Sequence, residues 1–102
     1  MTRAELIARI EAGETGPDID FRIDDVAHPQ GYIALNRKLS SCTPCYTTSI
    51  DDAVTLLAGC GWYVAESGKA SVWIGPNGPR YEARIRANPA AALVAAWLKA
   101  TA

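Results

Sequence analysis

YTTSIDDAVTLL (Tyr46–Leu57) is the stretch that decides the fold, together with the GCGW (Gly59–Trp62) that follows it. Ser49, or equally Thr48, can cap a helix, because its hydroxyl can accept a hydrogen bond from a backbone N–H of the first turn. Two aspartates follow in that turn, where the helix dipole favours negative charge, and apolar residues then recur at helical spacing. The first glycine of GCGW can adopt the left-handed conformation that ends a helix. The stretch therefore predicts a helix from Ser49 to Ala58 that leads directly into a strand.

Two further helices and three strands are predicted around this centre. A capping box predicts a helix from Thr2 to Ala12, and a proline at a first helical turn opens a closing helix from Pro89 to Ala100. Between these helices, alternating apolar runs separated by turn residues predict an antiparallel meander of strands. The strands are expected over Trp62 to Glu66, Ala70 to Ile74 and Tyr81 to Arg86. Both faces of the first two carry apolar side chains, which predicts a sheet covered on both sides.

The sequence does not decide the secondary structure of two segments. Asp18 to Val26 fits helical spacing and strand alternation equally well, and periodicity does not decide between them. Ala27 to Cys45 reads as an irregular connection with at most one edge strand, at Tyr32 to Leu35. The predicted fold is a single α+β domain over residues 1–102. Its mostly antiparallel sheet of three or four strands is expected to lie between helices, as an α/β/α sandwich.

Composition excludes several classes of protein. The chain is 49% hydrophobic and 21% charged, which is ordinary globular composition. Ten basic and eleven acidic residues leave a formal charge of -1, so generic binding to nucleic acid is not expected. No apolar run approaches the length of a membrane span, and the amino terminus lacks a signal-peptide core. We therefore expect a cytoplasmic protein whose three cysteines are reduced thiols.

The closing helix lacks the polar face that a solvent-exposed helix normally shows. Its second side is formed by small residues and one charge, namely Ala91, Ala92, Ala95, Ala96 and Lys99. Small side chains let another backbone approach closely, and symmetric dimers are the commonest soluble assemblies. This face predicts a homo-oligomer, or a docking site for another protein.

The cysteines raise the question of a metal. CTPC (Cys42–Cys45) has the spacing of a redox pair and of half a zinc site, and Cys60 and His28 would complete four ligands. Against the redox interpretation, Pro44 and the later helix cap place both thiols in a loop. Against zinc, the second half lacks paired spacing, so buried or loop thiols are the simpler interpretation.

Three groups of residues could contact a small ligand. Arginines on one face of the third predicted strand could bind an anion, although a solvated face also explains them. Hydroxyls at the predicted helix start could meet a phosphate, although capping alone accounts for them. Aromatic residues could stack on a base, although most such residues are core. The candidate ligand-binding residues are Tyr46, Thr47, Thr48, Ser49, Trp73, Arg80, Arg84 and Arg86.

Much of the chain resembles the phage ABA sandwich domain, a family of small phage and prophage proteins of largely unassigned function. The motifs that carry the resemblance are Tyr46–Leu57 before Gly61-Trp62, Tyr81-Glu82-Ala83, Pro89–Ala100, the opening Glu5–Ile10 and the helix-like Asp18 to Val26. The resemblance implies a central sheet between helical layers, a helix at Asp18 to Val26, and a phage or prophage origin. It implies no catalytic residues, and because Cys42, Cys45 and Cys60 replace residues that are normally not cysteine, it implies no metal site.

An enzyme is difficult to assemble from these residues. The single histidine, His28, lies beside Pro29 in a predicted loop, and neither a nucleophile elbow nor a glycine-rich phosphate loop is present in the sequence. We expect a binding protein without catalytic activity or cofactor, whose partner is a small molecule or a host protein. By analogy with other small phage proteins, its most concrete form is sequestration of a nucleotide-type host defence signal. The rival is a protein-interaction or structural module that acts through the closing helix.

Overall fold

The computed structural model describes residues 2–27, 45–85 and 88–101. Its elements, in chain order, are α1 (Arg3–Glu11), α2 (Pro17–Ala27), α4 (Ile50–Thr55), β1 (Cys60–Val64), β2 (Lys69–Ile74), β3 (Arg80–Arg84) and α5 (Pro89–Ala100). The three strands form an antiparallel sheet in the order β1-β2-β3. The predicted α+β class with a three-stranded antiparallel sheet is confirmed. The edge strand expected at Tyr32 to Leu35 lies outside the described residues.

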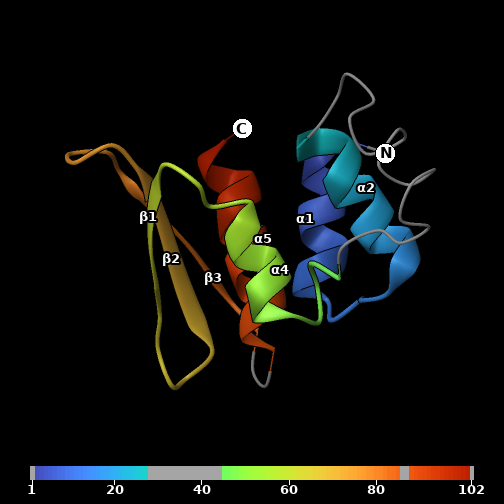
Figure 1. Ribbon diagram of the computed structural model, residues 1–102. Helices are drawn as coiled ribbons and strands as arrows, with labels where there is room; N and C mark the ends of the chain where they lie inside the picture. The colour runs from blue at the N-terminus through green and yellow to red at the C-terminus, as the bar shows by residue number, and fades with distance from the viewer. Residues whose placement is uncertain (1, 28–44, 86–87, 102) are drawn as a thin grey trace.

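The elements stack in three layers (Figure 1). Helix α5 lies across β2 and β3, and it also contacts α1 and α4 on its other sides. Helix α2 packs on α1, at the far side of the molecule from the sheet. The core therefore lies on both sides of α5, between this helix and the sheet and between this helix and α1.

The position of α5 corrects one expectation from the sequence. Every residue from Ala90 to Leu98 is buried, and Ala91, Ala92, Ala95 and Ala96 are completely inaccessible to solvent. A helix that is apolar all round is a helix buried on all sides. The alanine face thus packs within the chain and is not a surface on which a second protein could dock. An oligomer, if one forms, must use another surface.

The sheet has an inner face toward α5 and an outer face. Inner side chains such as Val72 and Ala83 are buried, whereas the outer-face Tyr63 is 61% exposed. Among the described residues, the helices lie on the inner side (Figure 1). The expected cover over both faces of the first two strands is therefore found on one face only. On the outer side of β1 and β2, no helix of the described residues covers the apolar side chains, so Tyr63 is exposed and Trp73 is half-buried.

Capping explains why the helices begin where the sequence predicts. The Ser49 hydroxyl accepts a hydrogen bond from the Asp52 N–H at 3.4 Å, and the Asn88 side chain accepts one from the Ala91 N–H at 3.1 Å. Helix α4 is shorter than predicted, because its last turns loosen before Gly59, which has the positive φ of 80° that a helix end requires.

The ambiguous segment before residue 28 is the helix α2. Its inward face carries two isoleucines, Ile19 and Ile23, and two aspartates, Asp20 and Asp24, all four of them buried. Buried aspartates on an apolar face need hydrogen-bond partners. These partners come from the turn before α4.

Candidate functional site

Two of the candidate ligand-binding residues belong to the interior. Tyr46 is 2% exposed and its hydroxyl donates to Asp24 Oδ1 at 2.7 Å. Thr47 is fully buried, and both its backbone N–H and its hydroxyl donate to Asp20 Oδ1, at 2.9 and 2.8 Å. Burial of Tyr46, together with its bond to Asp24, raises the pKa of its hydroxyl. These residues join α2 to the turn before α4 and are not accessible to a ligand.

The same network extends to the start of α5. The Thr47 carbonyl accepts a hydrogen bond from Asn88 Nδ2 at 2.9 Å, and the Thr47 hydroxyl accepts one from the Gly16 N–H at 3.2 Å. Thr47 thereby ties together three segments that are far apart in sequence. Its role is structural.

Asp20 is the charged centre of this network. Burial raises the pKa of its carboxyl, and the two hydrogen bonds from Thr47 oppose this change without cancelling it. The nearby carboxylate of Asp52 acts in the same direction as burial. Asp20 therefore retains a proton to higher pH in the folded protein than in the unfolded chain.

The remaining helix-start candidates also have local explanations. Ser49 is the N-cap of α4, and Thr48 is an exposed residue of the preceding turn. Helix α4 has only six residues, so its dipole offers little to an anion. The helix start predicted as a phosphate site is therefore a capped junction between elements.

The candidates on the sheet behave differently, because they lie on its outer face. In the strand register Trp73 stands between Gly61 of β1 and Arg80 of β3. A side chain at Gly61 would collide with the Trp73 indole, so the ring lies flat over that glycine. The Arg80 guanidinium stacks over the same indole, 4.7 Å from its centroid. This arrangement presents an oriented guanidinium on an exposed surface.

Arg84 lies further along the same face of β3. It is opposite Lys69 in the register, while Glu82 between the two arginines forms an ion pair with Lys69 at 3.1 Å. Both partners of that pair are substantially exposed, so it contributes little stability. Within the described part of the chain, no carboxylate lies within ion-pair distance of Arg80 or Arg84. Arg86, the third predicted arginine, lies outside the described residues.

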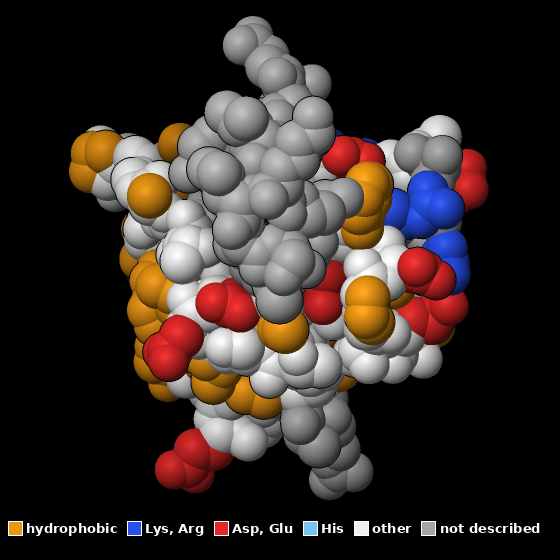
Figure 2. Space-filling view, turned by 45° about the vertical axis from the view of Figure 1, so that its right-hand side comes forward, with side chains coloured by type: hydrophobic (Ala, Val, Ile, Leu, Met, Phe, Trp, Pro, Cys, Tyr) orange, Lys and Arg blue, Asp and Glu red, His pale blue; other side chains and the backbone are white. Residues whose placement is uncertain are grey.

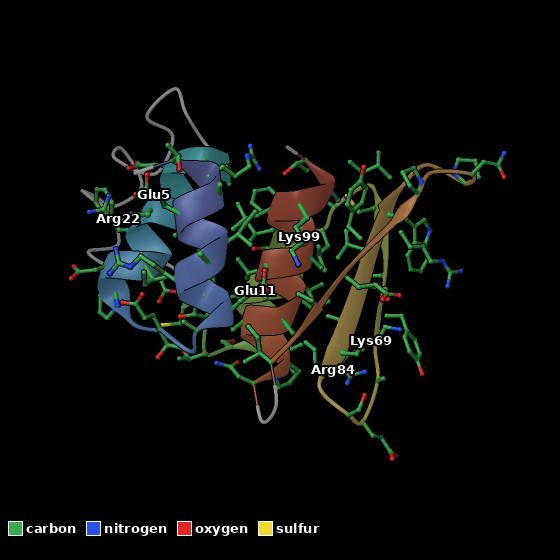
Figure 3. The ribbon with its side chains drawn as sticks, turned by 180° about the vertical axis from the view of Figure 1, so that it is seen from behind. Glu5, Glu11, Arg22, Lys69, Arg84 and Lys99 are labelled. Atoms are coloured by element: carbon green, nitrogen blue, oxygen red, sulfur yellow. The ribbon has the colours of Figure 1, made fainter. Side chains whose placement is uncertain are left out.

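An open cavity of about 280 Å³ adjoins the Arg84 end of this face. It is lined by Glu11, Lys69, Glu82, Ala83, Arg84 and Lys99. Figure 3 shows Lys99 reaching toward Glu11, and Lys69 and Arg84 on the sheet beside them. Lys99 Nζ lies 3.1 Å from Glu11 and also donates to the Glu82 carbonyl at 2.9 Å. Charged side chains thus continue from the outer face around the β3 edge, and two of the three cations there, Lys69 and Lys99, are paired with carboxylates.

Sequence reasoning missed Tyr63 as a surface residue. It is 61% exposed and lies on the same face as Trp73, two residues along β1 from Gly61. The alternation of the strand places it with Trp73, but only the position of α5 shows which of the two faces is open. We define the outer-face surface as Tyr63, Lys69, Trp73, Arg80 and Arg84.

The structure therefore divides the candidate residues into two separate groups. Trp73, Arg80 and Arg84 share the outer face of the sheet, whereas Tyr46 to Ser49 lie on the opposite side of α5, between α2 and α4 (Figure 1). A single small ligand cannot contact both groups. The outer-face surface therefore remains the candidate ligand-binding site.

The cysteines of the predicted zinc site are only partly described. Cys45 precedes α4 and is exposed, and Cys60 follows α4 and is half-buried; both are free thiols. The described residues contain no cluster of three or more side chains able to hold a metal ion. His28 and Cys42 lie outside them, so the four-residue set remains a sequence prediction.

Comparison with known proteins yields no relative. No protein-family model matches the chain, and neither the curated proteins nor the solved structures contain a significant match. The resemblance to the phage ABA sandwich domain therefore rests on the sequence motifs alone. Among the helices of the described residues, none combines the length and the apolar character needed to cross a membrane.

Proposed function

We propose that this protein is a non-enzymatic binding protein that holds a nucleotide-type ligand on the outer-face surface of its sheet. The observation that carries the proposal is the Arg80 guanidinium stacked over the Trp73 indole on an exposed face. A planar aromatic side chain beside an oriented cation is the combination that recognises a base and its phosphate. The chemical groups on this face match an anion that also carries a ring.

The stack prepares Arg80 for binding. A free arginine loses rotamer freedom when it binds a phosphate, whereas a guanidinium already held against a ring loses less. Because a stacked guanidinium meets the indole through its planar face, the N–H donors along its edges can make a bidentate contact with phosphate oxygens. Because Gly61 and Arg80 cover the two faces of the Trp73 indole, the exposed ring of Tyr63, on the neighbouring strand, is the aromatic surface on which a base can stack.

The spacing of the arginines favours an extended ligand. Arg80 and Arg84 are four residues apart on one strand, which corresponds to about 13 Å between their Cα atoms. A ligand that contacts both must carry anionic groups some distance apart. Cyclic dinucleotides, whose two phosphates lie on opposite sides of a ring, meet this requirement better than a mononucleotide, whose charge lies at one end.

The biological role that we attach to this site is sequestration. In a phage or prophage, the origin that the sequence resemblance implies, a small protein of this kind would withhold a nucleotide-type defence signal from its host receptor. This use requires tight binding and release of the unchanged ligand. It requires no catalytic group.

Thermal shift followed by calorimetry tests the proposal. The purified protein is screened against cyclic dinucleotides, ADP-ribose, AMP and inorganic phosphate. A ligand present at 100 times its dissociation constant should stabilise the folded state by about 2.7 kcal/mol. We expect an extended nucleotide to give the largest shift, and chromatography should recover it unaltered.

Matched variants locate the site. Arg80→Gln and Trp73→Leu should each weaken binding by at least tenfold. Arg22→Gln removes the same charge from an exposed position on α2, at the opposite end of the molecule (Figure 3), and should leave binding unchanged. Loss of binding in the Arg22 variant, or no shift with any nucleotide of the panel, contradicts the proposal. Conversion of the ligand to a product contradicts the proposal that the protein is not an enzyme.

A further inference from the structure

The two edges of the sheet differ in their free backbone groups. At the β1-β2 turn the Ala65 N–H donates to the Lys69 carbonyl at 2.8 Å, which identifies these two residues as a hydrogen-bonded pair. Because such pairs alternate along an antiparallel ladder, Tyr63 and Gly61 bond to β2. The N–H and C=O groups of Trp62 and Val64 therefore point away from the sheet, at its β1 edge.

The β3 edge is protected. The Ile85 N–H donates to the Gly68 carbonyl, so these two residues form a hydrogen-bonded pair between β3 and β2. Counted from this pair, the same alternation directs the N–H and C=O groups of Glu82 away from the sheet. The Glu82 carbonyl accepts a hydrogen bond from the Lys99 ammonium at 2.9 Å. Arg80, Glu82 and Arg84 add charged side chains along this strand. Charged residues at a sheet edge oppose pairing with another strand.

The β1 edge has none of these protections. Its sequence, CGWYV, contains no charged residue and no proline. Trp62 is 41% exposed, as α5 covers β2 and β3 but barely reaches the inner face of β1. Figure 2 shows hydrophobic side chains gathered along the left side of the molecule, the side on which Figure 1 places the sheet. An uncharged edge with exposed aromatic residues is a template for another strand.

We propose that β1 pairs with β1 of a second copy of this chain, antiparallel and about a two-fold axis at Tyr63, so that two three-stranded sheets become one continuous sheet. In this register Trp62 of each copy lies opposite Val64 of the other, and their outward N–H and C=O groups exchange hydrogen bonds. Tyr63 meets the partner's Tyr63 as a non-hydrogen-bonded pair, in which side chains are closest.

The chemistry of β1 favours a second copy over an unrelated peptide. A strand that pairs with itself must avoid like charges at opposite positions, and in this register the nearest charged residue, Glu66, falls opposite Cys60. Both faces gain contacts, with an aromatic pair outside and Trp62 against Val64 inside.

The surface area that the proposed dimer buries determines how stable we expect it to be. Aromatic side chains bury about 150–250 Å² each, so exposed fractions of 41% and 61% leave roughly 100 Å² on Trp62 and a similar area on Tyr63. Two copies therefore bury a few hundred Å² of aromatic surface, which is below the roughly 1,200–2,000 Å² of a stable interface. The dimer should form reversibly and depend on concentration.

Sedimentation velocity across a concentration series of the full chain tests this inference. We expect a monomer at low micromolar concentration and a dimer approaching millimolar concentration. Tyr63→Lys places two like charges opposite one another and should raise the dimer dissociation constant at least tenfold. Phe21→Lys introduces the same charge at a 40% exposed position on α2 and should leave dimerisation unchanged.

Cross-linking gives a second readout that does not depend on affinity. Serine replaces the three native cysteines, and Tyr63→Cys or Arg84→Cys is then introduced. The two Cα atoms of a non-hydrogen-bonded antiparallel pair lie about 4.5 Å apart, within the range of a disulfide. Mild oxidation should link the Tyr63 variant and leave the Arg84 variant monomeric. A wild type that remains monomeric near millimolar concentration, or equal cross-linking of both variants, overturns the proposal.

Discussion

Replacing Thr47 by valine removes one hydroxyl from the centre of the buried network and nearly preserves the shape of the side chain. The hydroxyl donates to Asp20 Oδ1 at 2.8 Å and accepts from the Gly16 N–H at 3.2 Å. A hydrogen bond to a charged group contributes about 1.5–3 kcal/mol and a neutral one about 0.5–1.5 kcal/mol. The free energy of unfolding should therefore fall by roughly 2–4 kcal/mol, since the backbone N–H of Thr47 still bonds to Asp20.

Urea denaturation measures this loss directly. For a domain of this size, a decrease of 2–4 kcal/mol should also lower the melting temperature by about 10 °C or more. Thr48→Val is the matched control, because Thr48 is the exposed neighbour, and its effect should stay within about 0.5 kcal/mol. A Thr47 variant as stable as the Thr48 variant would refute the reasoning, because it would show that the hydroxyl makes no net contribution inside the protein.

Three further predictions follow from the interior. Ala95→Glu should abolish cooperative folding, seen as loss of the circular dichroism transition, since an unpaired charge at a fully buried site costs more than about 4 kcal/mol; a folded variant would show that this side of α5 is accessible. Arg3→Ala should lower stability in urea by about 1–2 kcal/mol, because the guanidinium donates to the Leu98 carbonyl and the Thr101 hydroxyl, at 3.1 and 2.7 Å, and no loss would mean that these bonds do not form in solution. Because the pKa of Asp20 is raised on folding, this residue contributes stability that is fully present below its unfolded pKa of 3.8 and is lost as the pH rises through the folded pKa. Asp20→Asn should therefore gain stability relative to the wild type as the pH rises between these two pKa values, measured by urea titrations at a series of pH values. A stability difference that does not change with pH contradicts the raised pKa of Asp20.

Local signals in the sequence were sufficient to place α1, α4 and α5, whereas those of α2 fitted a strand equally well. Pro89 at a first turn and the apolar spacing after it predicted α5 with its observed bounds, and Ser49 acts as the cap of α4 as expected. Capping residues and apolar spacing act within a single helix, so the sequence of that segment alone is enough to predict it. The strands were also predicted in order, with starts up to two residues late, because turn residues fix the loops more sharply than the strand ends.

The layering could not be predicted in the same way. An alanine-rich helix packs equally well against a partner and against α1, and nothing in its own residues distinguishes the two. Thr47 looked like a capping or phosphate-binding hydroxyl because its acceptor, Asp20, is 27 residues away. Likewise Tyr63 and Trp62 alternate in β1, but only the position of α5 determines which face of the sheet stays open.

The most direct test of the central claim is an NMR titration of the indole N–H signals with a cyclic dinucleotide. The three tryptophans occupy different environments: Trp73 on the outer face, Trp62 on the inner side of β1, and Trp97 8% exposed within α5. If the outer-face surface binds the ligand, the Trp73 signal and the Arg80 Nε–H signal should shift together and saturate, while the Trp97 signal stays in place. Saturable shifts elsewhere with an unchanged Trp73 signal would contradict the account.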